Sequence, residues 1–83
     1  MKLKYFAWVA EIIEKREEEI ELPDHVKTID DLMNWLSDKN DGYRIAFNDK
    51  KKIKYAINQT LYKEYDSISR NDEVAFFPPM TGG

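Results

Sequence analysis

The sequence predicts a single two-layer domain of the α+β class, in which a mixed β-sheet packs on helices. Segments with an apolar residue at every second position lie near both ends of the chain, and segments with helical spacing lie between them. The chain has 83 residues, of which 42% are apolar. This is enough for one modest core, but it leaves no room for a second domain or a deep catalytic cavity.

The first 23 residues predict a strand, a helix and a second strand. Residues 2–5 alternate polar and apolar side chains, as a half-buried strand does. Residues 17–22 alternate again, with Ile20 and Leu22 expected to face inward, and Pro23 ends the strand because proline cannot donate to a sheet. We expect this strand to pair with the first as in a hairpin. The helix between them is predicted from the spacing of Phe6, Val9, Ile12, Ile13 and Arg16.

A second helix is predicted to begin after Thr28. Threonine is a good N-cap residue, and Asp31 stands three positions later, as in a capping box. The turn-forming residues 40–42 are expected to end this helix. Its apolar face is predicted to consist of Ile29, Leu32, Met33 and Leu36.

The C-terminal half predicts short strands separated by turns. Ile45 and Phe47 form a short apolar stretch, and residues 48–50 predict a turn before a strand around residues 53–57. Further turns are expected at residues 58–60 and 70–72, with a short extended piece at residues 61–62. The last strand, residues 73–77, is rich in β-forming residues and stops at a proline. We expect the first and last strands to meet in parallel at the centre of the sheet.

The last six residues, Pro-Pro-Met-Thr-Gly-Gly, predict a flexible tail that extends from a domain of residues 1–77. The prolines favour extended backbone, so residues 78–83 can reach roughly 20 Å from the fold. Two terminal glycines arise by chance about once in 200 sequences. A frayed end is the simpler explanation, but the chain has only one glycine elsewhere. The tail is therefore interpreted as a carboxyl end that enters a narrow cleft of a partner.

The composition excludes several classes of function. The chain has no cysteine and one histidine, His25, so it predicts no thiol chemistry, zinc site or catalytic triad. A net charge of −3 argues against nucleic-acid binding. The longest apolar run, residues 5–10, is far shorter than the ~20 residues that span a membrane. We expect a cytoplasmic protein that binds neither nucleic acid nor membranes.

Four other features are interpreted as structural. The lysines at positions 50–52 and 54, and the glutamates at positions 17–19, predict solvated surface rather than binding sites. Trp8 and Trp35 are expected to pack in the core or at its rim.

The C-terminal half resembles the small subunit of molybdopterin synthase, the MoaD-type sulfur carriers of the ubiquitin-like proteins. The residues that carry the resemblance are Asn-Gln-Thr-Leu at 58–61 and the segment Asn-Asp-Glu-Val-Ala-Phe-Phe-Pro-Pro-Met-Thr-Gly-Gly at 71–83. Tyr-Phe-Ala at 5–7, followed by Glu11, resembles the family's first strand and helix entry. A Gly-Gly end alone is common to all ubiquitin-like carriers, whereas Phe-Phe-Pro-Pro before it is specific to this branch.

The resemblance implies a β-grasp fold and a carrier function. The Gly83 carboxylate would be adenylated by an ATP-dependent adenylyltransferase of the ubiquitin-activating type and converted to a thiocarboxylate. The tail would then donate sulfur to cyclic pyranopterin monophosphate inside the large subunit of the synthase, with two carriers on each large-subunit dimer. The chain itself would bind no cofactor. The residues expected to contact these partners are Phe77, Pro78, Pro79, Met80, Thr81 and Gly82.

Two alternatives remain open at the level of the sequence. The chain could instead carry sulfur for thiamine synthesis or transfer-RNA thiolation, which Gly-Gly alone would also fit. It could also be a ubiquitin-like protein modifier or a binding module whose tail is only an address. An independent enzyme is disfavoured, because no acid–base or metal constellation is present.

Overall fold

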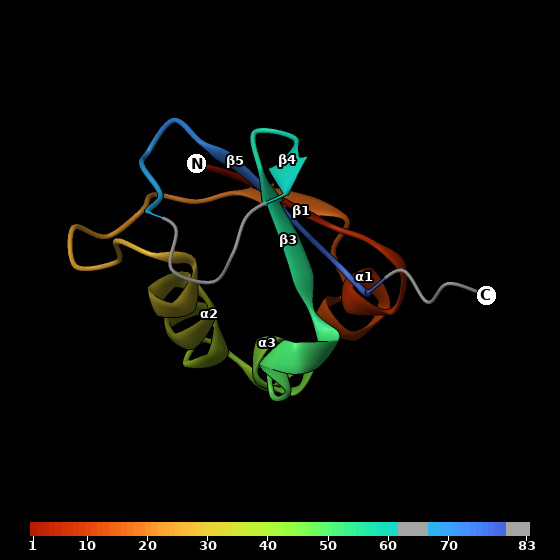
Figure 1. The fold of residues 1–83 in the computed structure, drawn as a ribbon. Coiled ribbons are helices and arrows are strands. Elements are labelled where there is room, and N and C mark those ends of the chain that lie inside the picture. Colours follow the sequence, from red (N-terminus) through yellow and green to blue (C-terminus); the bar gives the residue numbers. More distant parts are fainter. Residues whose placement is uncertain (62–66, 80–83) are drawn as a thin grey trace.

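The computed structural model describes residues 1–61 and 67–79 of the chain. Figure 1 shows helices and strands gathered around one sheet. In chain order they are β1 (Lys2–Tyr5), α1 (Ala7–Ile13), β2 (Glu17–Glu19), α2 (Ile29–Ser37), α3 (Asp41–Ala46), the 3-10 helix η1 (Lys50–Lys52), β3 (Lys54–Ile57), β4 (Thr60–Leu61) and β5 (Glu73–Phe77).

The last strand lies at the centre of the sheet. The described strands follow the order β2-β1-β5-β3-β4, and β5 runs parallel to β1 and antiparallel to β3. The pairing of β1 with β2 is antiparallel, and so is that of β3 with β4. The predicted parallel meeting of the first and last strands is confirmed. Because β5 is hydrogen-bonded on both sides, its end is a firm point of departure for the segment that follows.

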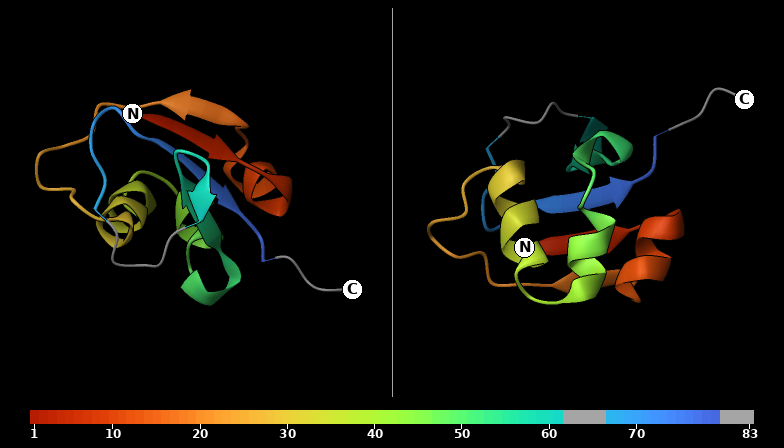
Figure 2. Two further views of the ribbon diagram at one scale, coloured as in Figure 1. Left: turned by 45° about the horizontal axis from the view of Figure 1, so that its top comes forward. Right: turned by 90° about the horizontal axis from the view of Figure 1, so that it is seen from below.

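The three α-helices all cover the same face of the sheet, as the view from below in Figure 2 shows. Among the described residues, no helix packs on the other face, which we call the open face. The core between helices and sheet includes side chains with no exposed surface, namely Leu3, Val9, Ile29, Leu32, Leu36, Val74 and Phe76. This arrangement confirms the predicted α+β class with a mixed sheet packed on helices.

Helix α2 forms as the sequence predicts. The Thr28 hydroxyl accepts a hydrogen bond from the Asp31 backbone N–H at 3.1 Å, and the Asp31 carboxylate accepts one from the Thr28 N–H at 3.3 Å. This reciprocal capping box satisfies two N–H groups that a helix terminus leaves unpaired. The predicted apolar face is buried at all four positions.

The segment after α2 differs from the prediction, because residues 41–46 form the helix α3 rather than an apolar stretch. Asparagine and aspartate favour turns, but they also cap helices, and here the Asn40 side chain accepts a hydrogen bond from the Tyr43 N–H at 3.1 Å. A Cβ atom at Gly42 would lie 3.0 Å from the carbonyl oxygen of Ile12. Glycine therefore lets α3 approach the backbone of α1 closely.

The boundaries of α1 and β2 also differ from the predicted ones. Phe6 has extended backbone and stands at the N-cap of α1 without a side-chain capping hydrogen bond, so it is not part of the helical face. The helix ends at Ile13, its C-cap residue Glu14 is left-handed with φ 66°, and Arg16 lies beyond it. Strand β2 stops at Glu19, although the alternation of exposure continues to the buried Leu22.

Strands β3 and β5 form where they were predicted. Leu61 of the predicted extended piece belongs to β4, and Tyr62 lies outside the described residues. Within residues 1–61 and 67–79, no helix is both long and apolar enough to cross a bilayer. Strand β5 ends at Phe77, and the division into a domain of residues 1–77 and a tail of residues 78–83 stays a prediction.

Candidate functional site

The root of the tail is fixed by buried aromatic side chains on the helix-covered face of β5. Phe76 has no exposed surface, and its ring stacks on Tyr5 with 6.1 Å between ring centres and on Phe47 at 4.9 Å with a tilt. Contacts of this kind add to the stabilisation from burial alone. The chain therefore leaves the sheet at a well-defined place, immediately after Phe77.

Phe77 points to the open face, because side chains alternate along a strand. Val74 and Phe76 are fully buried, whereas Ala75 and Phe77 are half-buried, which confirms the predicted alternation. The register places Phe77 opposite Lys54 of β3. Pro78 and Pro79, which follow it, are half-buried as well.

Phe6 adds a second aromatic side chain to this end of the open face. Its backbone is extended, and its N–H donates to the carbonyl oxygen of Phe76 at 3.0 Å, so it continues the parallel register of β1 and β5 by one residue. That register sets Phe6 beside Phe77. The Phe6 side chain is 49% exposed. The sequence prediction places Phe6 on the helical face, although the spacing of apolar residues changes from strand to helix at this residue.

The other end of the open face is charged. Lys2 pairs with Glu17 at 3.2 Å, and Lys4 pairs with Glu73 at 3.4 Å, with the Lys and Glu of each pair on neighbouring strands. The open face thus changes from ion pairs at the start of β5 to aromatic side chains at its end. This leaves the apolar surface where the tail departs, and exposed apolar patches of this kind mark contact sites.

An open groove of about 770 Å³ adjoins the tail exit on the helix-covered side. Ile45 of α3 is 59% exposed at its edge. No local sequence pattern predicts this groove, because residues 41–46 were not predicted to form α3. Its lining residues are Trp8, Ile45, Ala46, Asn48, Asp49, Lys52, Pro78 and Pro79. A second hollow, of about 610 Å³, lies between α1 and the β1–β2 pair and includes none of the tail residues. Charged side chains line it together with Tyr5, Phe6, Ala7 and Ala10.

A polar cluster around Glu18 corrects one prediction. Glutamates 17–19 were expected to be solvated, but the Glu18 side chain is only 17% exposed and belongs to the helix-covered face. Its carboxylate accepts hydrogen bonds from the hydroxyls of Tyr43 and, at 2.7 Å, Tyr5, and Lys15 donates to it at 3.3 Å. A run of charged residues usually predicts solvated surface. Here Glu18 lies opposite the buried Leu3 of β1, so its side chain points to the helix-covered face.

The electrostatics of the cluster keep Glu18 ionised at neutral pH. Burial alone would raise the pKa of Glu18, but hydrogen bonds from Tyr43, Tyr5 and Lys15 outweigh burial and lower the pKa. Burial and the same carboxylate raise the pKa of both tyrosines, so they stay neutral donors. All three donors converge on one saturated carboxylate, so the cluster holds β1, β2 and α3 together and has no free acid or base to offer a substrate.

The other sequence-predicted residues lie apart from the tail exit or outside the described residues. Met80, Thr81, Gly82 and Gly83 lie outside the described residues, so their roles stay predictions. His25 is exposed, as are lysines 50–52, whereas Trp8 and Trp35 pack against the edge of the core as predicted. In the described part of the chain, no three His, Cys, Asp or Glu side chains gather in a way that could hold a metal ion.

The mixed sheet, its helix-covered face and a tail that leaves the central strand define a ubiquitin-like β-grasp domain. Comparison with known proteins agrees with this class. The chain belongs to the ThiS family, whose model matches residues 3–83.

Two curated relatives match over the full length. The molybdopterin synthase sulfur carrier subunit of Haemophilus influenzae is 36% identical over 83 residues, which cover 100% of this chain and 99% of the relative. The protein of the same name from Escherichia coli is 34% identical with the same coverage. The resemblance drawn from the sequence to this family is confirmed.

Solved structures agree on the fold. SAMP1 from Haloferax volcanii superposes with a TM-score of 0.73 at 25% identity, covering 100% of this chain and 98% of its own. A putative molybdopterin converting factor, subunit 1, from Pyrococcus furiosus gives a TM-score of 0.75 at 26% identity, with 95% of each chain covered.

Proposed function

We propose that this chain is the sulfur carrier subunit of a molybdopterin synthase. The observation that carries the proposal is the full-length match to two relatives named as such subunits. The geometry supports it, since the tail leaves the central strand at a firmly held position beside exposed apolar surface. Its direct partner is the large subunit of that synthase, with two carriers on each large-subunit dimer, and it acts in the cytoplasm.

The chemistry of the proposal takes place at the Gly83 carboxylate. At neutral pH a terminal carboxylate is an anion, which resists attack by nucleophiles. A partner adenylyltransferase of the ubiquitin-activating type transfers AMP from ATP to the carboxylate and releases pyrophosphate, which gives an acyl adenylate with a good leaving group. A sulfur nucleophile then displaces AMP and leaves a thiocarboxylate. The carrier itself binds no cofactor, and ATP is used by the activating partner.

Inside the large subunit, the thiocarboxylate sulfur then bonds to a carbon of cyclic pyranopterin monophosphate. Water cleaves the acyl–sulfur bond, which leaves the sulfur on the substrate and returns the Gly83 carboxylate. Two such transfers form the dithiolene of molybdopterin. In this proposal, Phe6 and Phe77 contact the partner on the open face, Pro78 and Pro79 hold the start of the tail extended, and Met80, Thr81 and Gly82 lead the carboxylate into the active site.

The test is intact mass spectrometry of the untagged chain after incubation with the adenylyltransferase from its own genome, ATP and a sulfur donor. The expected result is a mass gain equal to the exchange of one oxygen for one sulfur, lost when Gly83 is deleted. Adding the large subunit and cyclic pyranopterin monophosphate should return the carboxylate mass, with two carriers consumed per molybdopterin formed. An unchanged mass, with an enzyme that charges the Escherichia coli relative, would contradict the proposal.

A second candidate is a ubiquitin-like protein modifier, because SAMP1 from Haloferax volcanii, a small archaeal modifier protein, shares the fold at 25% identity. In that case the activated tail would form isopeptide bonds with lysine side chains of other proteins. Stable adducts in an extract supplied with ATP would distinguish this function. A sulfur carrier instead gives up its sulfur and regains a free carboxylate, so it forms no such adducts.

A further inference from the structure

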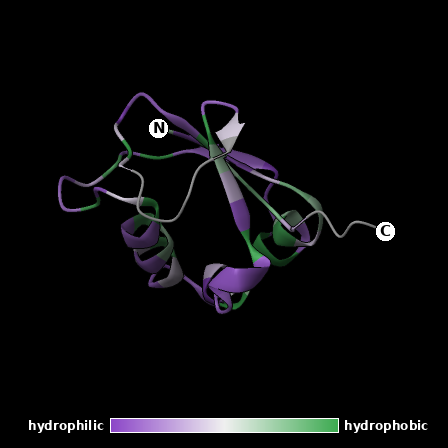
Figure 3. Ribbon diagram, viewed as in Figure 1, coloured by the Kyte–Doolittle hydropathy of each residue, from purple (hydrophilic) through white to green (hydrophobic). Residues whose placement is uncertain are grey.

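The groove on the helix-covered side of the tail exit contains apolar side chains and does not include Phe6 or Phe77 of the open face. Trp8 of α1 and Ala46 of α3 line it, and Ile45 exposes most of its side chain at the edge. Figure 3 shows α1 as a hydrophobic segment beside the hydrophilic η1. An exposed isoleucine next to a half-buried tryptophan gives an apolar pocket of the kind that holds one large side chain of a partner.

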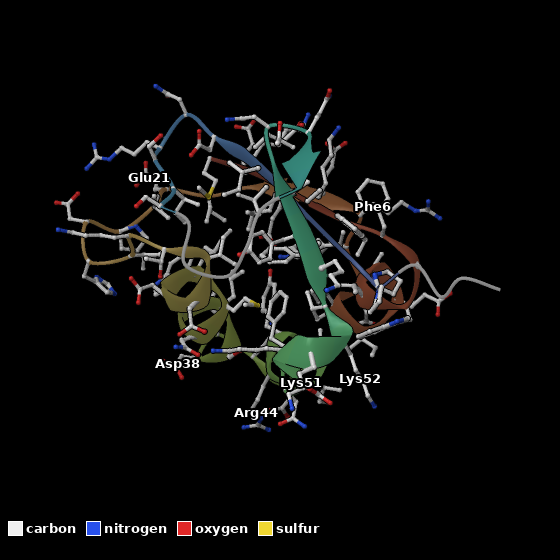
Figure 4. The ribbon with its side chains drawn as sticks, in the orientation of Figure 1. Phe6, Glu21, Asp38, Arg44, Lys51 and Lys52 are labelled. Carbon is white, nitrogen blue, oxygen red and sulfur yellow. The ribbon has the colours of Figure 1, made fainter. Side chains whose placement is uncertain are left out.

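The rim of this groove is positively charged on the η1 side. Lys52 lines the groove, and Lys51 and Lys52 make no ion pair with any described residue, whereas Lys50 pairs with Asp30. Asp49 also lines the groove, and its carboxylate accepts a hydrogen bond from the Lys51 backbone N–H at 3.1 Å. Figure 4 shows Lys51 and Lys52 together at the η1 end, with α1 between them and Phe6 in that view. In a chain of net charge −3, this local excess of lysine favours an acidic partner.

The groove is continuous with the tail. Pro78 and Pro79 form part of its lining and directly precede the last four residues. A protein that takes the tail into its active site therefore comes within a few residues of the groove.

We propose that the groove binds a segment of the protein that receives the tail, and that this segment carries a large apolar side chain beside a carboxylate. The apolar side chain fills the space between Trp8 and Ile45, and the carboxylate pairs with Lys52. This inference rests on the proposed function, because it takes the synthase large subunit as the protein that receives the tail. It adds a second contact surface, separate from Phe6 and Phe77 on the open face.

The first test uses Trp8 as a reporter. The chain is labelled with fluorotryptophan, titrated with the unlabelled large subunit and followed by fluorine NMR, with Trp35→Phe used to assign the two signals. Trp35 lies on α2 and is not among the groove residues, so it serves as an internal reference. The expected result is a shift or broadening of the Trp8 signal beyond the change at Trp35.

The second test compares variants by isothermal titration calorimetry with the same large subunit. Ile45→Ser and Lys52→Glu should each weaken binding by about tenfold, the usual size for a residue central to an interface. Lys51→Glu is the matched control, because it makes the same charge change one residue away without lining the groove, and it should stay within about twofold. Circular dichroism checks that each variant is folded.

The outcomes separate the two proposals. The groove contact would be overturned if the wild-type chain binds the large subunit normally, the Trp8 signal does not change, and Ile45→Ser and Lys52→Glu keep full affinity. The sulfur carrier function would then still stand. Equal weakening by Lys51→Glu and Lys52→Glu would also overturn it, because a general charge effect would then explain the result. Failure of the wild-type chain to bind the large subunit or to accept sulfur would overturn the proposed function and the groove contact with it.

Discussion

At the Glu18 cluster, side chains from β1, α3 and the α1–β2 loop all donate to one carboxylate, whereas at the tail exit Phe6, Phe77 and Ile45 leave apolar area in contact with water. The two regions are built from the same short elements, yet only the first satisfies its side chains within the chain. A buried polar group must be paired to avoid a penalty, whereas an exposed apolar group gains free energy only when something covers it. The first region therefore stabilises the fold, and the second is available to partners.

The largest effect expected from this comparison is the loss of the Glu18 carboxylate. Glu18→Ala leaves the hydroxyls of two buried tyrosines, Tyr5 and Tyr43, without this acceptor, and should lower the free energy of unfolding by roughly 2–3 kcal/mol. Urea denaturation monitored by circular dichroism measures it. Glu17→Ala is the control, since its pair with Lys2 is exposed to solvent and such pairs contribute little to stability. Equal losses in the two variants would mean that the cluster is not structural.

Removal of a single donor sharpens the comparison. Tyr43→Phe keeps the ring in the core and deletes only the hydroxyl, which donates to Glu18 and accepts from the exposed Lys15 at 3.2 Å, while Tyr5 and Lys15 still donate to Glu18. The expected loss is about 1 kcal/mol in the same denaturation experiment, smaller than that of Glu18→Ala. A loss as large as that of Glu18→Ala would show that Tyr43 alone carries the cluster.

The pH dependence of stability provides a third, smaller effect. The native pKa of Glu18 lies below its ordinary value of 4.5, so its ionised form stabilises the native state above that pH. This contribution is lost as the pH falls through the lowered native pKa. The difference in free energy of unfolding between the wild type and Glu18→Gln should therefore shrink as the pH drops below about 4.5. A difference that is constant from pH 7 to pH 3 would contradict this account.

The sequence predicted the core better than either of these regions. The apolar spacing of α2, its capping box and the central pairing of β1 with β5 all follow from local patterns, and the structure confirms each of them. The Glu18 cluster could not be predicted, because it brings together residues 5, 18 and 43, which no local pattern connects. The groove was missed because residues 40–42 signal both a turn and a helix start, and only the close packing of Gly42 on α1 selects the helix.

The tail exit was predicted in part, for a similar reason. The Phe-Phe-Pro-Pro segment shows from the sequence alone where the chain leaves the sheet, and the alternation along β5 gives the side on which Phe77 lies. The neighbour of Phe77 on the open face could be named only once the parallel register with β1 was known, because Phe6 is 71 positions away along the chain.

The smallest stability effect is expected at Phe6, where function and stability should separate. Phe6 stands at the N-cap of α1 and provides no capping hydrogen bond, so serine there would add a favourable cap of about 1 kcal/mol. The same change removes the half of the Phe6 side chain that is covered, which costs about as much. Phe6→Ser should thus unfold within about 0.5 kcal/mol of the wild type.

The affinity for the large subunit should fall in the same variant, although its stability does not change. If Phe6 and Phe77 form the open-face contact, Phe6→Ser weakens the affinity measured by calorimetry about tenfold, although the free chain is as stable as before. If Phe6→Ser changes neither the stability of the chain nor its affinity for the large subunit, the contact must lie elsewhere at the tail exit. A large loss of stability would instead mean that Phe6 belongs to the core, and the contrast between the closed cluster at Glu18 and the open surface at the tail would then fail at this residue.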